Sequence, residues 1–212
     1  MTETAVLRRH IGAQRREFAD LLDSLPGASW EAPSLCAGWR VRDVVAHMTI
    51  GFRYSLPRFV LEMLKARGNF NRMADQTARR DGSAFTPAEL AGLLHANADH
   101  PWKPPGSGYE APLGHDIIHG LDITVALGLE YLVPPQRLAI VLADTTPNSS
   151  SVKFFGADLS GVRLAATDLD FTFGTGATVE GLAQDLLLVI CGRKLPAGRL
   201  RGESADRFTA TS

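Results

Sequence analysis

The sequence predicts a mainly α-helical protein with a small α+β unit at its C-terminal end. Apolar residues recur at helical spacing over residues 3–24, and a second apolar stripe begins near residue 41. Farther along, residues 161–167 alternate apolar and other side chains with the period of a half-buried strand. We therefore expect a helical domain over residues 1–150 and a small α+β domain over residues 151–212.

Helix-ending and helix-starting residues delimit these elements. Pro26-Gly27 ends the first helix, and Thr86-Pro87-Ala88-Glu89 is a capping box that begins another. Residues 69–86 are polar, with three arginines and two asparagines, and a long connection is expected there. Further elements are expected as follows: an apolar helical run over 59–68, helices over 115–128, 135–142 and 179–190, a strand over 171–174 and a last short strand that includes Phe208.

The composition excludes several classes of protein. The chain has 45% hydrophobic and 21% charged residues and a formal net charge of -1, without the long basic run that nucleic acid binding requires. Its apolar runs are too short to span a bilayer, and its first residues lack a signal-peptide profile. We therefore expect a cytoplasmic protein with no nucleic acid or membrane partner.

The two cysteines, Cys36 and Cys191, are far apart in the sequence and do not form a CxxC pair. In a reducing compartment we expect both to be free thiols. Cys191 follows an apolar helical run and is expected in the core. Cys36 is expected in a loop before a helix, from which it could approach a site.

The segment that indicates chemistry contains His115, His119 and Asp122. Residues three and four apart lie on one face of a helix, so these three side chains stack. Two imidazoles one turn apart can bind one divalent metal ion, and the carboxylate can orient or join them. His47, beside the apolar stripe of an earlier helix, is the candidate third ligand. The sequence thus predicts a metal centre between helices, with His47, His115 and His119 as ligands and Asp122 as the candidate catalytic residue.

Other patterns are weaker. A single histidine beside an apolar stripe is usually structural, and this is what we expect of His10, His95 and His100. The string from His115 to His119 is similar to the His-Glu-x-x-His motif of zinc peptidases, with an aspartate in place of the glutamate. Aspartate is one methylene shorter, and no downstream helix supplies an obvious supporting ligand, so a peptidase is not favoured.

Both histidine segments resemble a known family. Residues 30–48, WEAPSLCAGWRVRDVVAHM, resemble the first signature of the mycothiol-dependent maleylpyruvate isomerase type of DinB-like protein. Residues 112–123, PLGHDIIHGLDI, resemble its second signature, and residues 161–193 resemble its usual C-terminal extension. The resemblance implies a DinB-like four-helix bundle that holds a metal ion at one end through His47, His115 and His119. The isomerase has glutamate at the position of His115, so the implied site here has three neutral imidazoles.

The function that these inferences support is metal-dependent thiol chemistry. A low-molecular-weight thiol of the mycothiol type would add to a small electrophilic substrate, with transfer or isomerisation as the outcome. The expected metal is zinc, although imidazole ligands also suit nickel, copper and iron. The alternative is a non-enzymatic metal-binding helical bundle with a regulatory or partner-binding role, and a homodimer is one form it could take.

Overall fold

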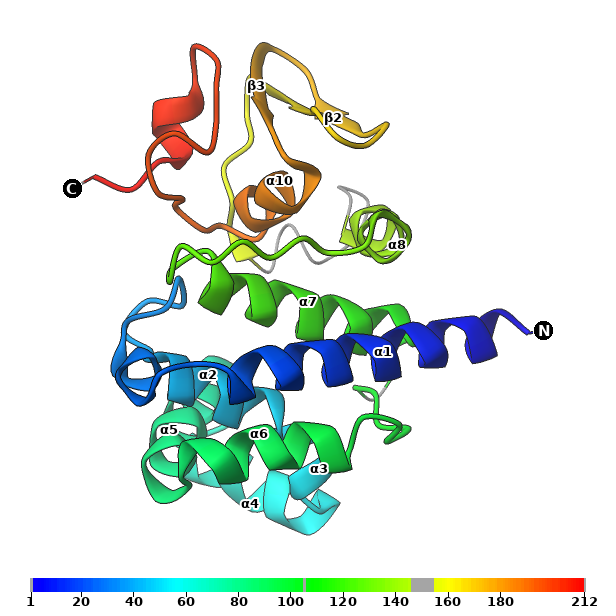
Figure 1. Ribbon diagram of the computed structural model, residues 1–212, viewed down its shortest axis with the longest axis vertical. Helices are drawn as coiled ribbons and strands as arrows, with labels where there is room; N and C mark the ends of the chain where they lie inside the picture. The colour runs from blue at the N-terminus through cyan, green and yellow to red at the C-terminus, as the bar shows by residue number, and fades with distance from the viewer. Residues whose placement is uncertain (1, 105, 146–154, 212) are drawn as a thin grey trace. The chain divides into compact units, whose positions relative to one another are not determined.

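The protein is mainly α-helical with one small β-sheet among the residues that the structure describes, as the sequence predicts (Figure 1). The structure is a computed structural model. It describes residues 2–104, 106–145 and 155–211. In this part of the chain, no helix combines the length and apolar character needed to cross a membrane.

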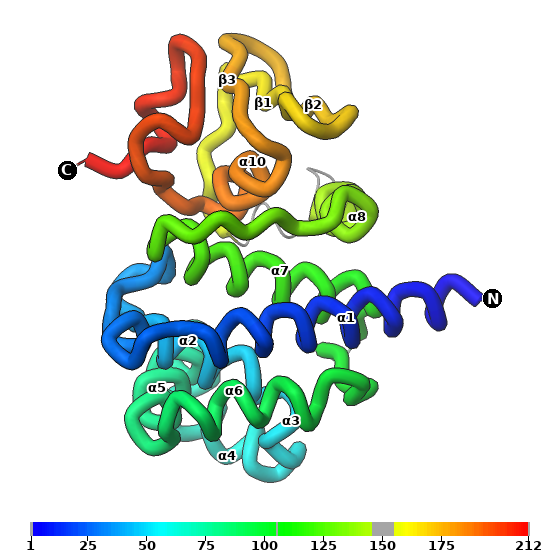
Figure 2. Tube along the Cα trace, in the orientation of Figure 1, coloured from blue at the N-terminus to red at the C-terminus, as the bar shows by residue number. Residues whose placement is uncertain are grey.

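The chain forms two compact units, residues 1–123 and residues 124–212. The tube in Figure 2 allows each unit to be traced separately. The domain boundary expected at residue 150 falls within residues 146–154, which lie outside the described residues, so that division stays a prediction.

Unit 1 is built from helices. In chain order these are α1 (Glu3–Asp23), the 3-10 helix η1 (Gly27–Glu31), α2 (Val41–Met48), α3 (Ile50–Arg53), α4 (Leu56–Lys65), α5 (Phe70–Ala84), α6 (Pro87–Ala96) and α7 (Glu110–Thr124). Helix α1 packs on α6 and α2 packs on α5. The predicted first helix and the capping box of α6 are confirmed, since the Glu89 N–H donates to Thr86 Oγ1 and Thr86 N–H donates to the Glu89 carboxylate.

The expectation of a long connection over residues 69–86 is wrong, because α5 occupies most of it. Asn69 caps this helix by accepting the N–H of Arg72 at 2.9 Å. The buried face of α5 has helical spacing but consists of small or polar residues, namely Met73, Ala74, Thr77, Ala78, Asp81 and Gly82. A search for large apolar residues therefore misses it.

Small residues on α5 allow the backbone of α2 to approach closely. A Cβ atom on Gly82 would lie 2.3 Å from the Oδ1 of Asp43 and 3.0 Å from its Cα. Real Cβ atoms essentially never lie as close as 2.3 Å to another heavy atom, and the 3.0 Å approach to the backbone is also unusually tight, so any larger residue at position 82 would push α2 and α5 apart or displace Asp43.

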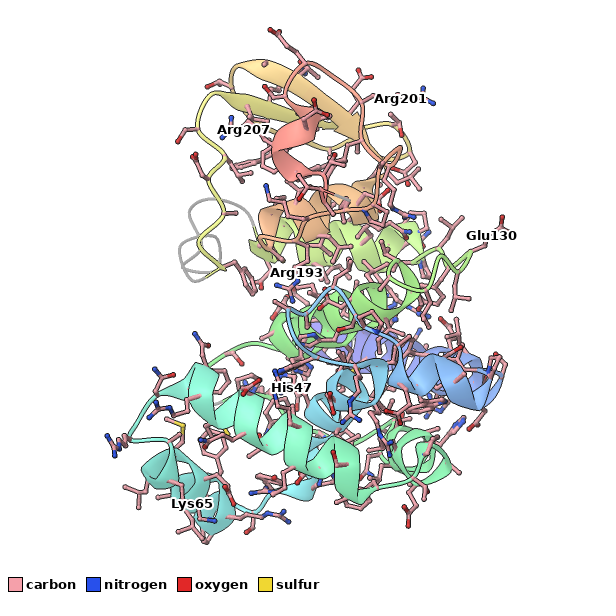
Figure 3. All side chains as sticks on the ribbon, turned by 90° about the vertical axis from the view of Figure 1, so that its left-hand side faces the viewer. His47, Lys65, Glu130, Arg193, Arg201 and Arg207 are labelled. Atoms are coloured by element: carbon pink, nitrogen blue, oxygen red, sulfur yellow. The ribbon has the colours of Figure 1, made fainter. Side chains whose placement is uncertain are left out.

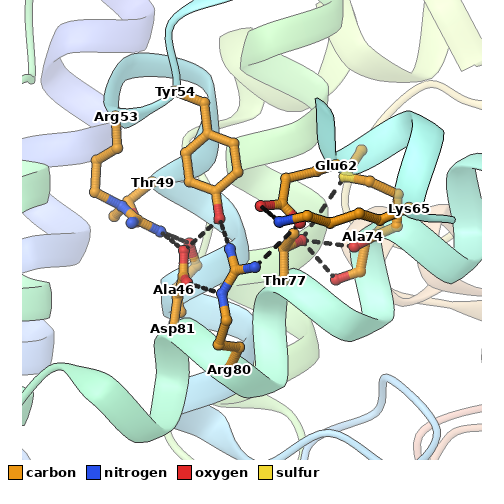
Figure 4. A network of polar contacts seen from close by, with 11 residues as sticks. Ala46, Thr49, Arg53, Tyr54, Glu62, Lys65, Ala74, Thr77, Arg80 and Asp81 are labelled. Carbon is orange, nitrogen blue, oxygen red and sulfur yellow. Dashed lines mark hydrogen bonds and ion pairs between the residues drawn. The ribbon is translucent and has the colours of Figure 1, made fainter. Parts of the chain in front are cut away.

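An ion-pair network centred on the buried Arg53–Asp81 pair ties α3 to α5 (Figure 4). Asp81 accepts hydrogen bonds from Arg53 at 2.8 Å, from the Tyr54 hydroxyl at 2.7 Å and from Arg80 at 3.0 Å. Arg80 also donates to Glu62 of α4 at 3.1 Å, which extends the network to a third helix. The Asp81 side chain is only 4% exposed, so its charge depends on these donors.

Helix α4 has an unusual orientation. Its buried residue is Glu62, whereas most of its large aliphatic side chains face outward. Leu56 and Leu64 are 71% and 70% exposed, and Val60 and Leu61 are about half exposed. This apolar face of α4 is a feature that the sequence pattern alone would have assigned to the core.

Unit 2 contains α8 (Pro135–Thr145), the strands β1 (Val162–Ala166), β2 (Thr172–Gly174) and β3 (Ala177–Gly181), α10 (Ala183–Ile190) and the 3-10 helix η2 (Ala205–Phe208). The sheet has the order β2-β1-β3, with β1 antiparallel to β2 and parallel to β3. The strand pair expected at 161–167 and 171–174 is thereby confirmed.

Two expectations for unit 2 are wrong. The helix expected over residues 179–190 begins only at Ala183, because the preceding residues form β3 and Asp168 accepts the Ala183 N–H at 2.7 Å. The last strand expected around Phe208 is instead η2, in which Phe208 is buried. Both errors concern short elements, where tertiary pairing decides between helix and strand.

We predict that Asp81→Asn destabilises the protein by about 3 kcal/mol at neutral pH, because it leaves Arg53 buried without its charge partner. Urea unfolding followed by circular dichroism measures this. Asp99→Asn is the control, since Asp99 makes an exposed ion pair with Arg16 and its loss should cost less than about 1 kcal/mol.

The same variant should change the acid sensitivity of folding. Burial raises the pKa of Asp81, but the hydrogen bonds and charges of Tyr54, Arg53 and Arg80 outweigh it and the pKa is lowered. A carboxylate with a lowered folded-state pKa stabilises the protein fully above its unfolded pKa, and this stabilisation is lost as the pH falls through the lowered value. In Asp81→Asn the free energy of unfolding should therefore decrease less steeply than in the wild type as the pH falls below about 4. An equally steep decrease in both proteins would contradict this role of Asp81.

Candidate metal centre

Three imidazoles from two helices of unit 1 come together around one point. His47 is in the last turn of α2, and His115 and His119 are one turn apart on α7. The ring centroids lie 5.1 Å apart for His47 and His115, 5.0 Å for His47 and His119, and 4.7 Å for His115 and His119. One nitrogen from each ring lies within 4.8 Å of the other two. The structure thus brings together the three residues that the sequence predicts as ligands.

Local helix geometry explains part of this arrangement. The four-residue spacing of His115 and His119 places both rings on one face of α7. On α2, Val44, Val45 and Met48 are buried around His47 and fix which way the helix faces. His47, labelled in Figure 3, therefore lies among the helices of unit 1.

Buried carboxylates orient both rings of α7. The Nδ1 of His115 lies 3.2 Å from the Oδ1 of Asp116, and the Nδ1 of His119 lies 3.0 Å from the Oδ2 of Asp122. The two aspartate side chains are 2% and 0% exposed. Carboxylates that hold Nδ1 leave Nε2 as the nitrogen available to a ligand, the arrangement found in metal sites.

Asp116 has a second contact that sequence reasoning missed. Its Oδ2 accepts from the Nε of Arg15 on α1 at 2.7 Å, and both side chains are 2% exposed. In a zinc peptidase motif this position would act on a water molecule, whereas here the carboxylate is bound to Arg15 and His115. Asp116 therefore serves to fix His115 relative to α1.

The environment of His47 favours the neutral imidazole. Burial lowers the pKa of His47 well below its ordinary value, and the nearby charges of His119 and His115 lower it further, while Asp122 acts in the opposite direction. Its Nδ1 is buried and has no hydrogen-bond partner among the described residues. A neutral ring with an unsatisfied buried nitrogen, next to two oriented imidazoles, fits the donor set of a divalent metal such as zinc.

Two residues of the loop before α2, Cys36 and Trp39, also lie next to this site. The Sγ of Cys36 lies 3.0 Å from the Oδ2 of Asp122 and 3.7 Å from the Nδ1 of His119. The ring of Trp39 lies 5.1 Å from that of His47, and its Nε1–H donates to Asp75 at 2.9 Å. The sequence indicated only that Cys36 could approach a site, because a loop carries no periodicity that predicts its direction.

His95 and His100, which were expected to be structural, make hydrogen-bond contacts outside the three-imidazole site. His95 lies 3.0 Å from the carboxylate of Asp23. The Nδ1 of His100 accepts the N–H of Trp102 at 3.1 Å.

Comparison with known proteins supports the family resemblance. Residues 11–101 match the family model of the mycothiol maleylpyruvate isomerase N-terminal domain. This segment contains His47 and Cys36 but ends before His115 and His119. A search of curated proteins finds no match.

Two solved structures have a similar fold. A crystal structure of the mycothiol-dependent maleylpyruvate isomerase matches with a TM-score of 0.60 and 14% sequence identity, over 96% of this chain and 94% of that one. A crystal structure of a histidine-to-alanine mutant of that enzyme matches with a TM-score of 0.59, at the same identity and coverage. At this identity the likeness is one of fold. Residues 11–101 are thus similar to the mycothiol maleylpyruvate isomerase N-terminal domain, and the fold over nearly the whole chain is similar to that of the isomerase.

Proposed function

We propose that the protein is a metal-dependent thiol transferase or isomerase that acts on a small electrophilic substrate, with its metal held by His47, His115 and His119. The observation that supports this most directly is the convergence of the three imidazoles, with ring centroids 4.7–5.1 Å apart. The proposed metal is zinc, for which three nitrogen ligands from protein and one open position are a common catalytic arrangement.

The residues around the three rings would prepare them for this role. Asp122 holds the Nδ1 of His119, and Asp116 together with Arg15 holds the Nδ1 of His115, so neither ring is free to turn. The lowered pKa of His47 keeps this ring neutral, and its unpartnered Nδ1 would be satisfied on ligation. When bound, a divalent ion is a Lewis acid that favours thiolate over thiol at neutral pH.

The thiol is proposed from the relatives. The matching family model and the similar structure both carry mycothiol in their descriptions, so a low-molecular-weight thiol of that type is the proposed cosubstrate. The substrate is proposed only as a class, a small molecule with an electrophilic carbon. A shared fold at 14% identity does not transfer a substrate, because the cavity residues that recognise it differ freely between such relatives.

A second candidate function also has a specific observation in its favour. A non-enzymatic metal-binding module with a partner-binding role would expose an apolar surface, and the apolar face of α4 is one. This candidate shares the metal site with the first but predicts no thiol-dependent turnover.

We predict that the wild-type chain binds a divalent ion and that His119→Ala weakens binding more than about 100-fold. Loss of a ligand should exceed the roughly 10- to 100-fold effect of losing an outer-shell partner. Metal analysis after gel filtration and calorimetric titration with Zn²⁺ measure this. His95→Ala is the matched control, because that histidine is on α6 and pairs with Asp23. Equal metal content in wild type and His119→Ala would contradict the site.

We predict thiol-dependent turnover by the metal-loaded protein. With a mycothiol-type thiol and maleylpyruvate as the first electrophile tried, product formation followed by NMR should require metal. His47→Ala should lower kcat/KM by about 100-fold or more, because metal-ion catalysis contributes several kcal/mol. His95→Ala should keep the wild-type rate. Metal binding without any turnover across a panel of electrophiles would favour the second candidate instead.

A further inference from the structure

We infer that Cys36 is a positioning residue of this metal site, which acts through Asp122 on His119. The inference rests on the proposed function, because it concerns a ligand of the proposed metal. It assigns a role to a thiol that lies outside the histidine motif and for which the matching family model states no role.

One carboxylate oxygen links the three residues. The Oδ2 of Asp122 lies 3.0 Å from the Sγ of Cys36 and 3.0 Å from the Nδ1 of His119. The thiol S–H and the imidazole N–H both donate to this oxygen. Because the Asp122 side chain is 0% exposed, these protein donors take the place of water in fixing the plane of the carboxylate.

The loop before α2 holds the thiol in place through its backbone. The Leu35 N–H donates to the carbonyl oxygen of Asp122 at 2.9 Å, so loop and helix are joined at the same residue twice. Within the loop, Cys36 N–H donates to Ser34 Oγ at 3.2 Å, and Trp39 N–H donates to the Cys36 carbonyl at 2.9 Å. These hydrogen bonds fix the backbone of Cys36, so the position of Sγ does not depend on the side-chain rotamer alone.

The geometry favours positioning over ligation. Cys36 lies 3.7 Å from the Nδ1 of His119, which is the nitrogen that Asp122 holds. With Asp122 and Cys36 both at Nδ1, the nitrogen left for the metal is Nε2, on the opposite side of the ring from the sulfur. The atoms of Cys36, His119 and Asp122 are themselves close enough to bind an ion together, so ligation by sulfur is the alternative that an experiment must exclude.

Removal of the thiol has two opposing effects. The Oδ2 of Asp122 would then be shared by one donor fewer, and its hydrogen bond to the Nδ1–H of His119 would strengthen, which favours metal binding. Asp122 also loses one of the donors that fix its plane, and a carboxylate that turns away no longer orients the ring. For partners of metal-ligating histidines the loss of orientation dominates and costs affinity.

The test compares metal affinity in full-length variants. We expect Cys36→Ala to weaken Zn²⁺ and Co²⁺ binding by about 10-fold, the lower end of the range for such partners, because a thiol is a weak donor. Cys36→Ser should stay within about 3-fold of wild type, since its hydroxyl also donates to Asp122. Cys191→Ala, a change of the buried cysteine in unit 2, is the matched control and should leave affinity unchanged.

The Co²⁺ spectrum separates positioning from ligation. A positioning thiol gives no sulfur-to-cobalt charge-transfer band, and Cys36→Ala then leaves the spectrum of the loaded protein unchanged. An intense band that disappears in Cys36→Ala would overturn the inference. Unchanged or tighter binding by Cys36→Ala would overturn it as well.

A second route covers the case in which Cys36→Ala folds poorly. Methyl methanethiosulfonate converts an accessible Cys–SH to Cys–S–S–CH₃ with release of methanesulfinic acid, and dithiothreitol reverses it. Treatment of the wild-type protein should weaken metal binding and reduction should restore it, while Cys36→Ser should not respond. Insensitivity of the wild type to full modification of Cys36 would overturn the inference. Failure of the wild type to bind metal at all would instead refute the proposed function.

Discussion

The structure of the site depends on two buried carboxylates of α7. Asp116 joins His115 to Arg15 of α1, and Asp122 joins His119 to the loop that precedes α2. Each carboxylate thereby fixes one imidazole to one other element of unit 1. Without these contacts, two histidines on a helix would be free to adopt several rotamers, and a third from α2 would have no defined partner.

Burial of these charges has a cost that the fold must offset. Arg15 and Asp116 are both 2% exposed, and a buried pair gains little net stability over apolar residues of similar size. The Nη1 of Arg15 also donates to the backbone carbonyls of Asn97, Ala98 and His100 at 3.2–3.5 Å, so the buried guanidinium has hydrogen-bond acceptors besides Asp116. The network is better explained by the orientation that it gives to α1, α7 and His115 than by stability.

The comparison with the isomerase is consistent with this view of the fold. Nearly the whole chain superimposes on that enzyme although only 14% of the residues are identical. Helix packing tolerates exchange of apolar residues of similar volume, whereas a site depends on particular atoms. The two proteins thus share a helical scaffold. The chemistry of this chain depends instead on the particular atoms of the three imidazoles, their carboxylates and Cys36.

The sequence by itself determined the local features of this protein. The four-residue spacing of His115 and His119 places both rings on one face of a helix, and the residues from Thr86 to Glu89 determine where α6 begins, because both depend only on neighbours in the chain. Periodicity also indicated the mainly helical class. It failed for α5, whose buried face consists largely of small and polar residues that periodicity of large apolar side chains does not detect.

The sequence named His47 as a candidate, but only the tertiary structure decided that it and Cys36 reach the histidine segment of α7. His47 is 68 positions before His115, and Cys36 is 86 positions before Asp122. Their approach depends on how α2, α7 and the loop before α2 pack, and no spacing rule predicts such contacts. The outward apolar face of α4 has the same origin, since the partners of Glu62, an arginine of α5 among them, determine which side of that helix is buried.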